Sequence, residues 1–341
     1  VRDVLRARAI DALLVPSSDP HLSEYLPARW QGRQWLSGFT GSMGTLAVTL
    51  EHAALFADSR YWVQAEAELA GSGIDLVKIP AGNPNIHLDW LAAEVRKEGS
   101  VAVDGDVLGL ASARALTAAL AAKQIRLETG ADVLAEAWPD RPALPTAPVY
   151  AHLPPHAAVS RVAKFAQVRE EMARTGASHH FVSTVDDIAW LTNLRGADVT
   201  YNPVFLAHLM LDADTATLFV GAGKVDDTLA ATLAADGITL APYAAAGDAL
   251  AALPADAVLL IDPRRVTHGL LARVPSSVKV VEALNPSTRA KSRKTAEEAA
   301  HVREAMIEDG IAMCEFYAWF EQALGRERIT ELTIDERLSA A

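Results

Sequence analysis

The sequence predicts an α/β fold that occurs twice along the chain, because three short matches recur in the same order. The segment WLSGFTG (35–41) matches WLTNLRG (190–196) as W-L-x-x-[FL]-x-G. Leu-Phe at 55–56 matches Leu-Phe at 218–219, and Val-Asp at 103–104 matches Ile-Asp at 261–262. The separations of 155, 163 and 158 residues are nearly equal. They favour a duplicated domain over two units that merely share strand–turn–strand patterns.

The composition is that of a globular protein with two or three domains. The chain has 341 residues, of which 50% are hydrophobic and 22% are charged. Its formal net charge of −12 argues against a nucleic-acid partner, since binding phosphates requires clustered Lys and Arg. No apolar run approaches the roughly 18–20 residues that cross a bilayer, so we expect no membrane partner.

Cys314 is the only cysteine of the chain, which excludes an internal disulfide. A single thiol suits a reducing compartment, and we expect a cytoplasmic location. Cys314 falls within an aromatic, helical stretch, where it is predicted to be buried and inert.

The first unit, expected over residues 1–142, alternates helices and strands. An amphipathic helix over 1–9 precedes a short apolar strand at 12–15. Strands at 45–50 and 53–57 form a hairpin around Glu51-His52, and further strands are expected at 74–79 and 100–103. Helices are expected at 61–69 and 111–123, and the second is rich in alanine, which has the highest helix propensity.

A semi-rigid connector is predicted between the two units, at residues 143–158. Six prolines fall within 138–155, and each fixes φ and removes a backbone donor. The second unit, expected over 159–287, opens with a helix that Ser160 caps and Gly176 ends. Strands are expected at 180–183, 206–211, 217–220, 257–261 and 278–281, with a DADT turn at 212–215 and helices at 226–235 and 267–273.

The last part, residues 288–341, is predicted to begin a third domain. A long helix is expected over 291–324, with Thr295 and Glu298 forming a capping box. Its apolar stripe is wider than an isolated helix leaves in water, so other polypeptide is expected to cover it. Residues 329–341 are expected to be disordered or packed in a non-native way. The stripe contains Val302, Met306, Met313, Phe316, Phe320 and Leu324.

No pattern in the chain forms a complete catalytic or metal site. The glycines at 38, 41 and 44 lack the strand-then-helix order of a nucleotide loop. No H-E-x-x-H occurs, and the adjacent His179 and His180 point to opposite faces of a strand, which favours structural roles. A hairpin turn explains Asp212 better than a cation does, and a capping box with Thr184 explains Asp187. We therefore predict no catalytic residue and no metal ligand within 1–341.

Four stretches resemble the three-domain type of Xaa-Pro aminopeptidase (aminopeptidase P). SGFTGSMGTLAVTLEHAALFADSRYWVQAEAEL (37–69) and WPDRP (138–142) resemble its first domain. DDIAWLTNLRGADVTYNPVF (186–205) is similar to its second domain and is the most specific stretch. AKSRKTAEEAAHVREAMIEDGIAMCEFYAWFE (290–321) is similar to the opening helix of its catalytic domain. The resemblance covers essentially the whole chain in the same order.

The resemblance implies two creatinase-N-like α/β domains followed by the first helices of a pita-bread α+β catalytic domain. It also implies removal of an N-terminal residue that precedes proline, so the expected partners are peptides with proline at the second position, and the expected assembly is a homodimer. The resemblance implies two divalent metal ions in the complete enzyme, and Mn²⁺ is the metal expected first. The five side chains that bind these ions would be downstream of residue 341. We therefore expect this chain to bind no metal ion and, on its own, to be inactive.

Three residues carry over from the matching motifs as a wall of the substrate site: Arg60 in ADSRYW, and Tyr201 and Asn202 in VTYNPVF. For Arg60 the alternative is an ion pair between domains, and for Asn202 a turn that positions the next strand. Two alternatives stay open for the chain as a whole. It could be a non-catalytic peptide-binding or dimerisation module, or it could belong to a creatinase-like amidinohydrolase, which is built similarly.

Overall fold

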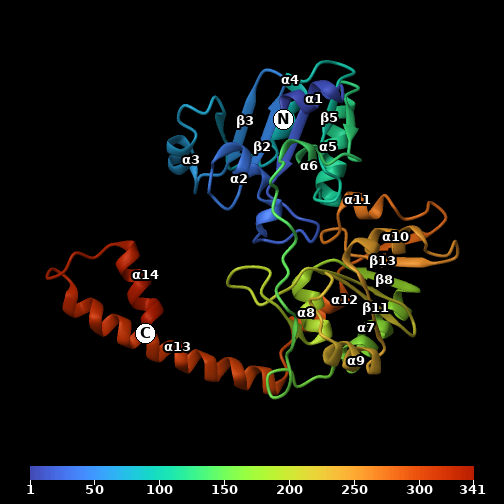
Figure 1. The fold of residues 1–341 in the computed structure, drawn as a ribbon, viewed down its shortest axis with the longest axis vertical. Coiled ribbons are helices and arrows are strands. Elements are labelled where there is room, and N and C mark those ends of the chain that lie inside the picture. Colours follow the sequence, from blue (N-terminus) through green and yellow to red (C-terminus); the bar gives the residue numbers. More distant parts are fainter.

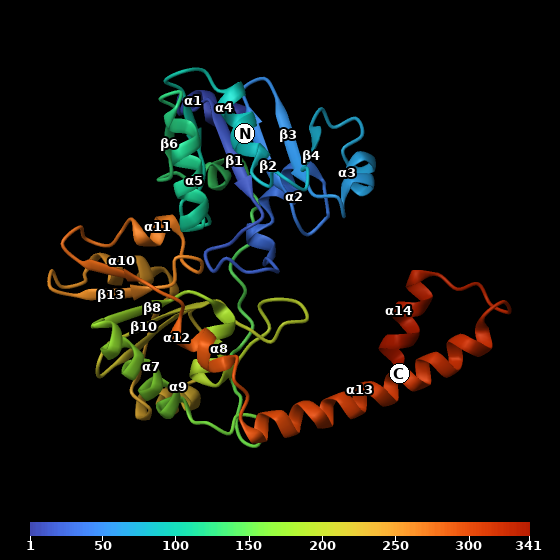
Figure 2. The same cartoon turned by 180° about the vertical axis from the view of Figure 1, so that it is seen from behind.

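The computed structural model describes residues 1–341 as two α/β units and a helical arm (Figure 1). The arm leaves the second unit and extends away from both units (Figure 2). No helix in the structure is both long enough and apolar enough to pass through a membrane.

The first unit is a six-stranded sheet with helices on both faces. In spatial order the strands are β4 (Asp75–Lys78), β3 (Ala53–Ala57), β2 (Thr45–Thr49), β1 (Ala12–Pro16), β5 (Ser100–Ala102) and β6 (Arg126–Glu128). β2 alone runs against its neighbours. The helices are α1 (Arg2–Ala7), α2 (Gly32–Ser37), α3 (Trp62–Glu68), α4 (Ile86–Glu94), α5 (Leu110–Ala121), α6 (Val133–Ala137) and the short 3₁₀ turn η1 (Ala28–Trp30).

The second unit repeats this sheet in order and direction. Its strands are β12 (Ile238–Pro242), β11 (Ala216–Val220), β10 (Ala207–Leu211), β8 (His179–Val182), β13 (Val258–Ile261) and β14 (Lys279–Glu282), and β10 is the antiparallel one. A small ribbon pairs β7 (Tyr150–Ala151) with β9 (Leu194–Arg195). The helices are α7 (Arg161–Thr175), α8 (Val185–Thr192), α9 (Asp227–Ala235), the 3₁₀ turn η2 (Tyr243–Ala245), α10 (Ala246–Ala251), α11 (His268–Leu271) and α12 (Pro286–Lys291).

The predicted duplication is confirmed in backbone detail. Gly38 and Asn193, equivalent in the W-L-x-x motif, both end a helix in the left-handed conformation, with φ of 72° and 52°. Asp104 and Asp262 follow equivalent strands, and each carboxylate accepts the backbone N–H two residues later, at 2.9 and 3.0 Å. The alternative of two unrelated units is therefore wrong.

Local signals in the sequence predicted the main elements well. Ser160 and Gly176 begin and end α7, and Thr295 and Glu298 form the capping box of α13 (Ala296–Ala323). The predicted helix over 291–324 is wrong at its start, because residues 292–295 separate α12 from α13. The sequence missed several short helices, namely α2, α4, α6, α10 and α12. It also missed the edge strands β6 and β12 and the two-stranded ribbon of β7 and β9.

The helical arm bears on three further predictions, of which it contradicts one. Residues 331–340 form α14 (Glu331–Ala340), close to the second helix that the sequence predicts from Thr333, and α14 packs back on α13 (Figure 2). Phe316 is buried, but Val302 and Met306 of the apolar stripe are 50% and 57% exposed, and its covering by other polypeptide stays a prediction. Cys314, predicted to be buried, is exposed.

Thr184 makes no side-chain cap at the start of α8, so the capping box predicted with Asp187 is also wrong.

The two units meet through a reciprocal pair of backbone hydrogen bonds. The N–H of Leu110 donates to the carbonyl of Val266 at 3.2 Å, and the N–H of His268 donates to the carbonyl of Leu108 at 2.7 Å. Leu108 and Val266 are 158 residues apart, as are Leu110 and His268. Equivalent loops of the two repeats therefore pair with each other, as the same patch does in a two-fold symmetric dimer.

An insertion in the first repeat completes this contact. Leu13 and His180 occupy equivalent positions in the two sheets, which makes Pro16 equivalent to Ser183. Eighteen residues separate Pro16 from Trp35, but only six separate Ser183 from Trp190. The first repeat thus has twelve extra residues here, and one of them, Trp30, is 8% exposed and packs in the core of the second unit.

Two buried histidines lie where the insertion meets the second unit. His21 Nδ1 is 2.7 Å from the carbonyl oxygen of Ser183, which can only accept, so Nδ1 carries the proton and Nε2 accepts from the Tyr243 hydroxyl at 2.8 Å. The Ser183 hydroxyl donates to the carbonyl of Pro20 and accepts from His208 Nδ1 at 3.1 Å. The rings of His21 and His208 stack at 4.6 Å. The neutral forms of both rings satisfy this network.

We predict that acid weakens the contact between the units through these histidines. Burial lowers the pKa of both His21 and His208, and for His208 the charge of His21 lowers it further, while Asp19 and Asp198 oppose the shift at His21. The unfolded chain gains protons below the ordinary pKa of about 6.5 that the folded chain does not. Each ring can therefore remove up to about 1.4 kcal/mol of stability per pH unit below that value.

The measurement is the urea midpoint at pH 7.5 and pH 5.5 for the wild type and for His208→Gln. Asp104, whose pKa burial raises to about 6, works in the opposite direction in both proteins, so the difference between the two pH slopes isolates the histidine. The wild type should lose more stability on acidification than the variant. Equal slopes would contradict the prediction.

Candidate functional site

A groove lies on the boundary between the two units. Its larger part has a volume of about 590 Å³ and is lined by residues 24–26, 31–34 and 40–42 in part from the first unit and by 199–202 from the second. A smaller hollow of about 290 Å³ shares Glu24, Tyr25, Val199 and Asn202 with it and continues to Arg265 and the start of α8. Segments far apart in sequence therefore form one polar groove.

The second-unit wall is the loop that precedes β10, yellow-green in Figure 1. The loop begins at Gly196. A Cβ on Gly196 would lie 2.7 Å from the Cβ of Phe205, so no side chain fits there without a shift. Asp198 is fully buried, accepts the N–H of Leu206 at 2.7 Å and pairs with Lys224 at 2.5 Å. These contacts anchor both ends of the loop below its tip.

Tyr201 lies at the tip of that loop. Its φ of 61° is uncommon for a bulky side chain and costs roughly 1–2 kcal/mol. Its side chain is fully exposed and has no packing partner in the chain. The N–H of Asn202 donates to the carbonyl of Val199 at 3.4 Å, which is a turn, as the alternative for Asn202 predicted.

The first-unit wall is held by a buried guanidinium. Arg33 donates to the Ser17 hydroxyl at 2.7 Å and to the carbonyls of Phe39 and Gly41 at 3.0 and 2.5 Å. Burial lowers the pKa of Arg33. Each of its three nitrogen atoms donates one hydrogen bond within the first unit, so Arg33 holds the shape of this wall.

Arg60 does not lie with the other two predicted wall residues. Its guanidinium donates to the Asp58 carboxylate at 3.0 and 2.8 Å, and its side chain is 63% exposed. The hydrogen bond from Arg60 lowers the pKa of Asp58. Both partners belong to the first unit, so the alternative of an ion pair between domains is wrong. Tyr201 and Asn202 line the groove together, and Arg60 does not.

Several polar side chains of the groove make no hydrogen bond or ion pair with the protein. Two of them, Glu24 and Tyr25, belong to the twelve-residue insertion, which sequence reasoning about motifs missed. Aligning the two repeats would have found them, because the extra residues stand out there. These unpartnered side chains include Glu24, Tyr25, Gln34, Thr200, Tyr201 and Asn202 of the larger hollow and Arg265 of the smaller one.

The acidic and histidine side chains of the chain do not gather into a metal centre. No group of three or more His, Cys, Asp or Glu lies close enough to hold an ion. His180 is buried and hydrogen-bonds the carbonyl oxygen of Leu260 at 3.0 Å, the structural role expected of it. Asp212 accepts the N–H groups of Asp214 and Thr215 in its hairpin turn. This donor set does not fit two divalent ions.

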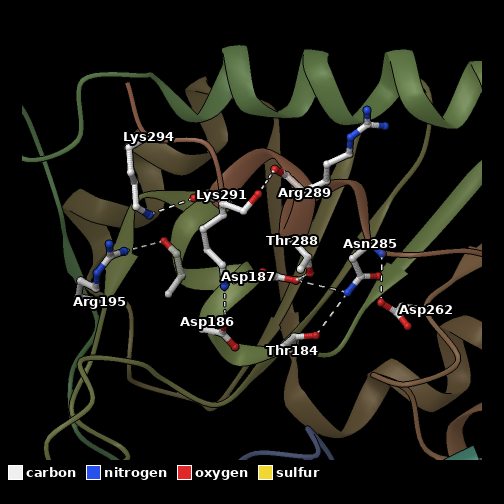
Figure 3. Close-up of polar contacts among 12 residues, drawn as sticks. Thr184, Asp186, Asp187, Arg195, Asp262, Asn285, Thr288, Arg289, Lys291 and Lys294 are labelled. Carbon is white, nitrogen blue, oxygen red and sulfur yellow. Dashed lines mark hydrogen bonds and ion pairs between the residues drawn. The ribbon is translucent and has the colours of Figure 1, made fainter. Parts of the chain in front are cut away.

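A buried polar network fixes the base of the helical arm to the second unit (Figure 3). Asp187 on α8 is 1% exposed, accepts from Thr288 at 2.6 Å and lies 2.8 Å from Lys291 Nζ. Lys291 also pairs with Asp186, and these two carboxylates raise its pKa against the effect of burial. Asn285 donates its backbone N–H to Asp262 at 3.2 Å. The network ties α12, and with it the start of the arm, to α8.

Family models with the same description match the two units. A family model described as the creatinase/prolidase N-terminal domain matches residues 1–134, and a second model of that description matches residues 140–298. The chain belongs to the creatinase/prolidase N-terminal domain family.

The curated relatives are Xaa-Pro aminopeptidases. Xaa-Pro aminopeptidase 1 of Dictyostelium discoideum is 31% identical over 334 residues, which are 95% of this chain and 53% of the relative. A probable Xaa-Pro aminopeptidase P of Verticillium alfalfae is 33% identical, over 96% of this chain and 55% of the relative. The likeness covers nearly the whole chain, and the chain spans about half the length of the curated relatives it matches.

One solved structure has the same fold over nearly the whole chain. It is an X-prolyl aminopeptidase from Caenorhabditis elegans, described as a cytosolic enzyme with a di-nuclear active site. The TM-score is 0.88 at 24% identity, over 97% of this chain and 55% of that one. The arrangement of the two units and the arm is therefore that of a known fold.

Proposed function

We propose that this chain is the non-catalytic part of an Xaa-Pro aminopeptidase and narrows the approach to its active site. The observation that supports this most is the extent of similarity, which covers nearly all of this chain but about half of its Xaa-Pro aminopeptidase relatives. The donor set described above does not fit a pair of metal ions. In the proposed complete enzyme, residues outside 1–341 hold two divalent ions, and Mn²⁺ is the metal proposed.

In this proposal the chain consists of four parts, which are residues 1–142, 143–158, 159–287 and 288–341. The first and third are creatinase-like domains, the second is their linker and the fourth begins the pita-bread peptidase domain. The loop with Tyr201 and the helical arm project from the same side of the molecule in both views (Figures 1 and 2). A domain built on the arm would thus face the groove, which supports Tyr201 and Asn202 as a wall of the substrate site.

Arg60 keeps a separate place in this proposal. Its side chain pairs with Asp58 on the exposed surface of the first unit, outside the groove, so it takes no part in the proposed wall of the substrate site. We propose a homodimer in the cytoplasm that acts on peptides with proline at the second position.

We predict that this chain alone does not hydrolyse Xaa-Pro peptides. The measurement is release of alanine from Ala-Pro and Ala-Pro-Ala in the presence of Mn²⁺, for residues 1–341 and for a longer product of the same gene. The chain should show no turnover above the buffer blank, and the longer product should release alanine. An Asp, Asp, His, Glu and Glu series encoded downstream of Ala341 would agree with this result.

Turnover by residues 1–341 themselves would show that the metal ligands are misplaced in this proposal. If no peptidase domain is encoded downstream, the chain is instead a peptide-binding module. The unpartnered side chains around the groove favour a peptide-binding module over a creatinase-like amidinohydrolase. No feature of the structure supports the amidinohydrolase.

A further inference from the structure

We infer that a second cavity, the crevice at the carboxyl edge of the first sheet, binds a small organic acid whose phosphate or carboxylate group contacts Arg264. The crevice has a volume of about 560 Å³, within the usual range of about 300–1,000 Å³ for ligand sites. It shares no lining residue with the larger part of the groove and only Leu22 with the smaller hollow. The inference does not depend on the proposed function, because the crevice is separate from the proposed wall of the substrate site.

The topology of the first sheet places this crevice where open α/β sheets usually bind ligands. β1, β3, β4 and β5 run in the same direction, so their carboxyl ends meet at one edge of the sheet. Residues that directly follow three of these strands line the crevice, namely Ser17, Asp58 and Ile79. The chain lays its strands from β1 outward to β4 and then resumes with β5 on the other side of β1. Ligands of such sheets bind outside the carboxyl ends, at this reversal of strand order.

The equivalent edge of the second sheet is already filled by protein. Ser183 follows β8, where its hydroxyl donates to the carbonyl of Pro20 and its own carbonyl accepts from His21. Both partners belong to the insertion, which only the first repeat contains. The second repeat has no such segment to place over the edge of the first sheet. One of the two equivalent crevices is therefore closed, and the other remains open.

Arg264 supplies the free charge of the open crevice. Its equivalent in the first repeat, 158 residues earlier, is Asp106. Asp106 reaches across the boundary between the units and pairs with Arg273 at 3.0 Å. Arg264 crosses the boundary in the other direction and lines the crevice, where its guanidinium makes no hydrogen bond or ion pair with the protein. A free guanidinium in a cavity favours a ligand with a phosphate or carboxylate group.

The other polar groups of the crevice do not oppose an anion. The Asp58 carboxylate is paired with Arg60 at 2.8 Å. Burial lowers the pKa of His87 against the charge of Asp89, so this ring is neutral at pH 7. Ser112 adds a hydroxyl without a partner in the protein, and it lies in the first turn of α5, near the positive end of the helix dipole.

The rest of the lining is largely apolar and restricts the ligand further. Leu14, Leu22 and Ile79 contribute to it, and Met43 is 48% exposed at its rim. An inorganic anion would contact only the polar groups. An acid with an aromatic or aliphatic body would also remove this apolar surface from water, which favours binding. The crevice thus suits a molecule with one anionic group and an apolar body.

The test is ligand-observed NMR titration of residues 1–341 with phenyl phosphate, phenylacetate, benzyl alcohol and inorganic phosphate. At least one aromatic acid should bind roughly tenfold more tightly than benzyl alcohol, which lacks the charge, and than inorganic phosphate, which lacks the body. The tighter of the two acids identifies the anionic group. Arg264→Gln should weaken binding of that acid by roughly tenfold. The matched control is Arg265→Gln, since this neighbouring arginine lines the smaller hollow instead, and it should change binding by less than about twofold.

A second variant, Ser112→Asp, closes the site to anions without threatening the fold. Ser112 is exposed, and an aspartate in the first turn of a helix is favourable, so the urea midpoint should not fall. Binding of the acid should be lost. The inference is overturned if neither acid binds more tightly than benzyl alcohol, if Arg264→Gln and Arg265→Gln have equal effects, or if Ser112→Asp binds the acid as the wild type does.

Discussion

Lys224→Met is expected to lower the free energy of unfolding of the second unit by about 3–5 kcal/mol. The side chains of Lys224 and Asp198 are 2% and 0% exposed, and their charged atoms are 2.5 Å apart. Lys224 also donates to the carbonyl of Ala147, at 2.8 Å. Methionine would leave the Asp198 carboxylate buried without a counter-charge and would release the linker from the loop that carries Tyr201.

Urea denaturation of residues 1–341 measures this change, with Lys97→Met as the control. Lys97 is 70% exposed and lies 4.0 Å from Glu98, so its removal should change the free energy of unfolding by about 0–1 kcal/mol. The double variant Lys224→Met with Asp198→Leu should be more stable than Lys224→Met alone, because no buried charge is then left unpaired. A loss below about 1 kcal/mol for Lys224→Met would contradict the reasoning.

Gly269→Ala is expected to separate the two units without unfolding either of them. A Cβ at Gly269 would lie 2.6 Å from the carbonyl carbon of Gly105 and 2.7 Å from the backbone nitrogen of Asp106. These are backbone atoms of the opposite unit, so they cannot move aside as a side-chain end can. The reciprocal hydrogen bonds between Leu110 and Val266 and between His268 and Leu108 must then lengthen or break.

Small-angle scattering and thermal unfolding measure this effect together. The variant should show a larger radius of gyration and two resolved unfolding transitions. Overpacking of this kind typically costs about 1–3 kcal/mol. The matched control is Gly310→Ala on α13, where a Cβ meets nothing within 4 Å and alanine favours the helix. Scattering and unfolding curves identical to the wild type would show that the contact between the units yields easily.

Most of the secondary structure could be predicted from the sequence, and two of the missed strands share a cause. Apolar strands in the middle of the sheets, such as β3, are buried along their whole length and form clear apolar runs. The missed strands β6 and β12 lie at sheet edges with exposed residues, so they lack that pattern. Ser160 and Thr295 were identified correctly because a cap depends on residues three positions away.

The candidate site could be predicted only in part. Tyr201 and Asn202 belong to one short motif, so the structure places both in the groove. Arg60 belongs to a different motif, and its neighbour Asp58 pairs with it at a site outside the groove. Glu24 and Tyr25 belong to no motif, and only the comparison of the two repeats reveals their segment as an insertion.

The sequence by itself determined the class of fold, its duplication and the order of its parts, because caps, apolar periodicity and repeated motifs act over a few residues. The tertiary structure alone decided which side chains share the groove, how His21 reaches Ser183, and that equivalent loops of the repeats pair. These contacts join residues more than a hundred positions apart. Their formation depends on how two complete units pack, which no local pattern of residues encodes.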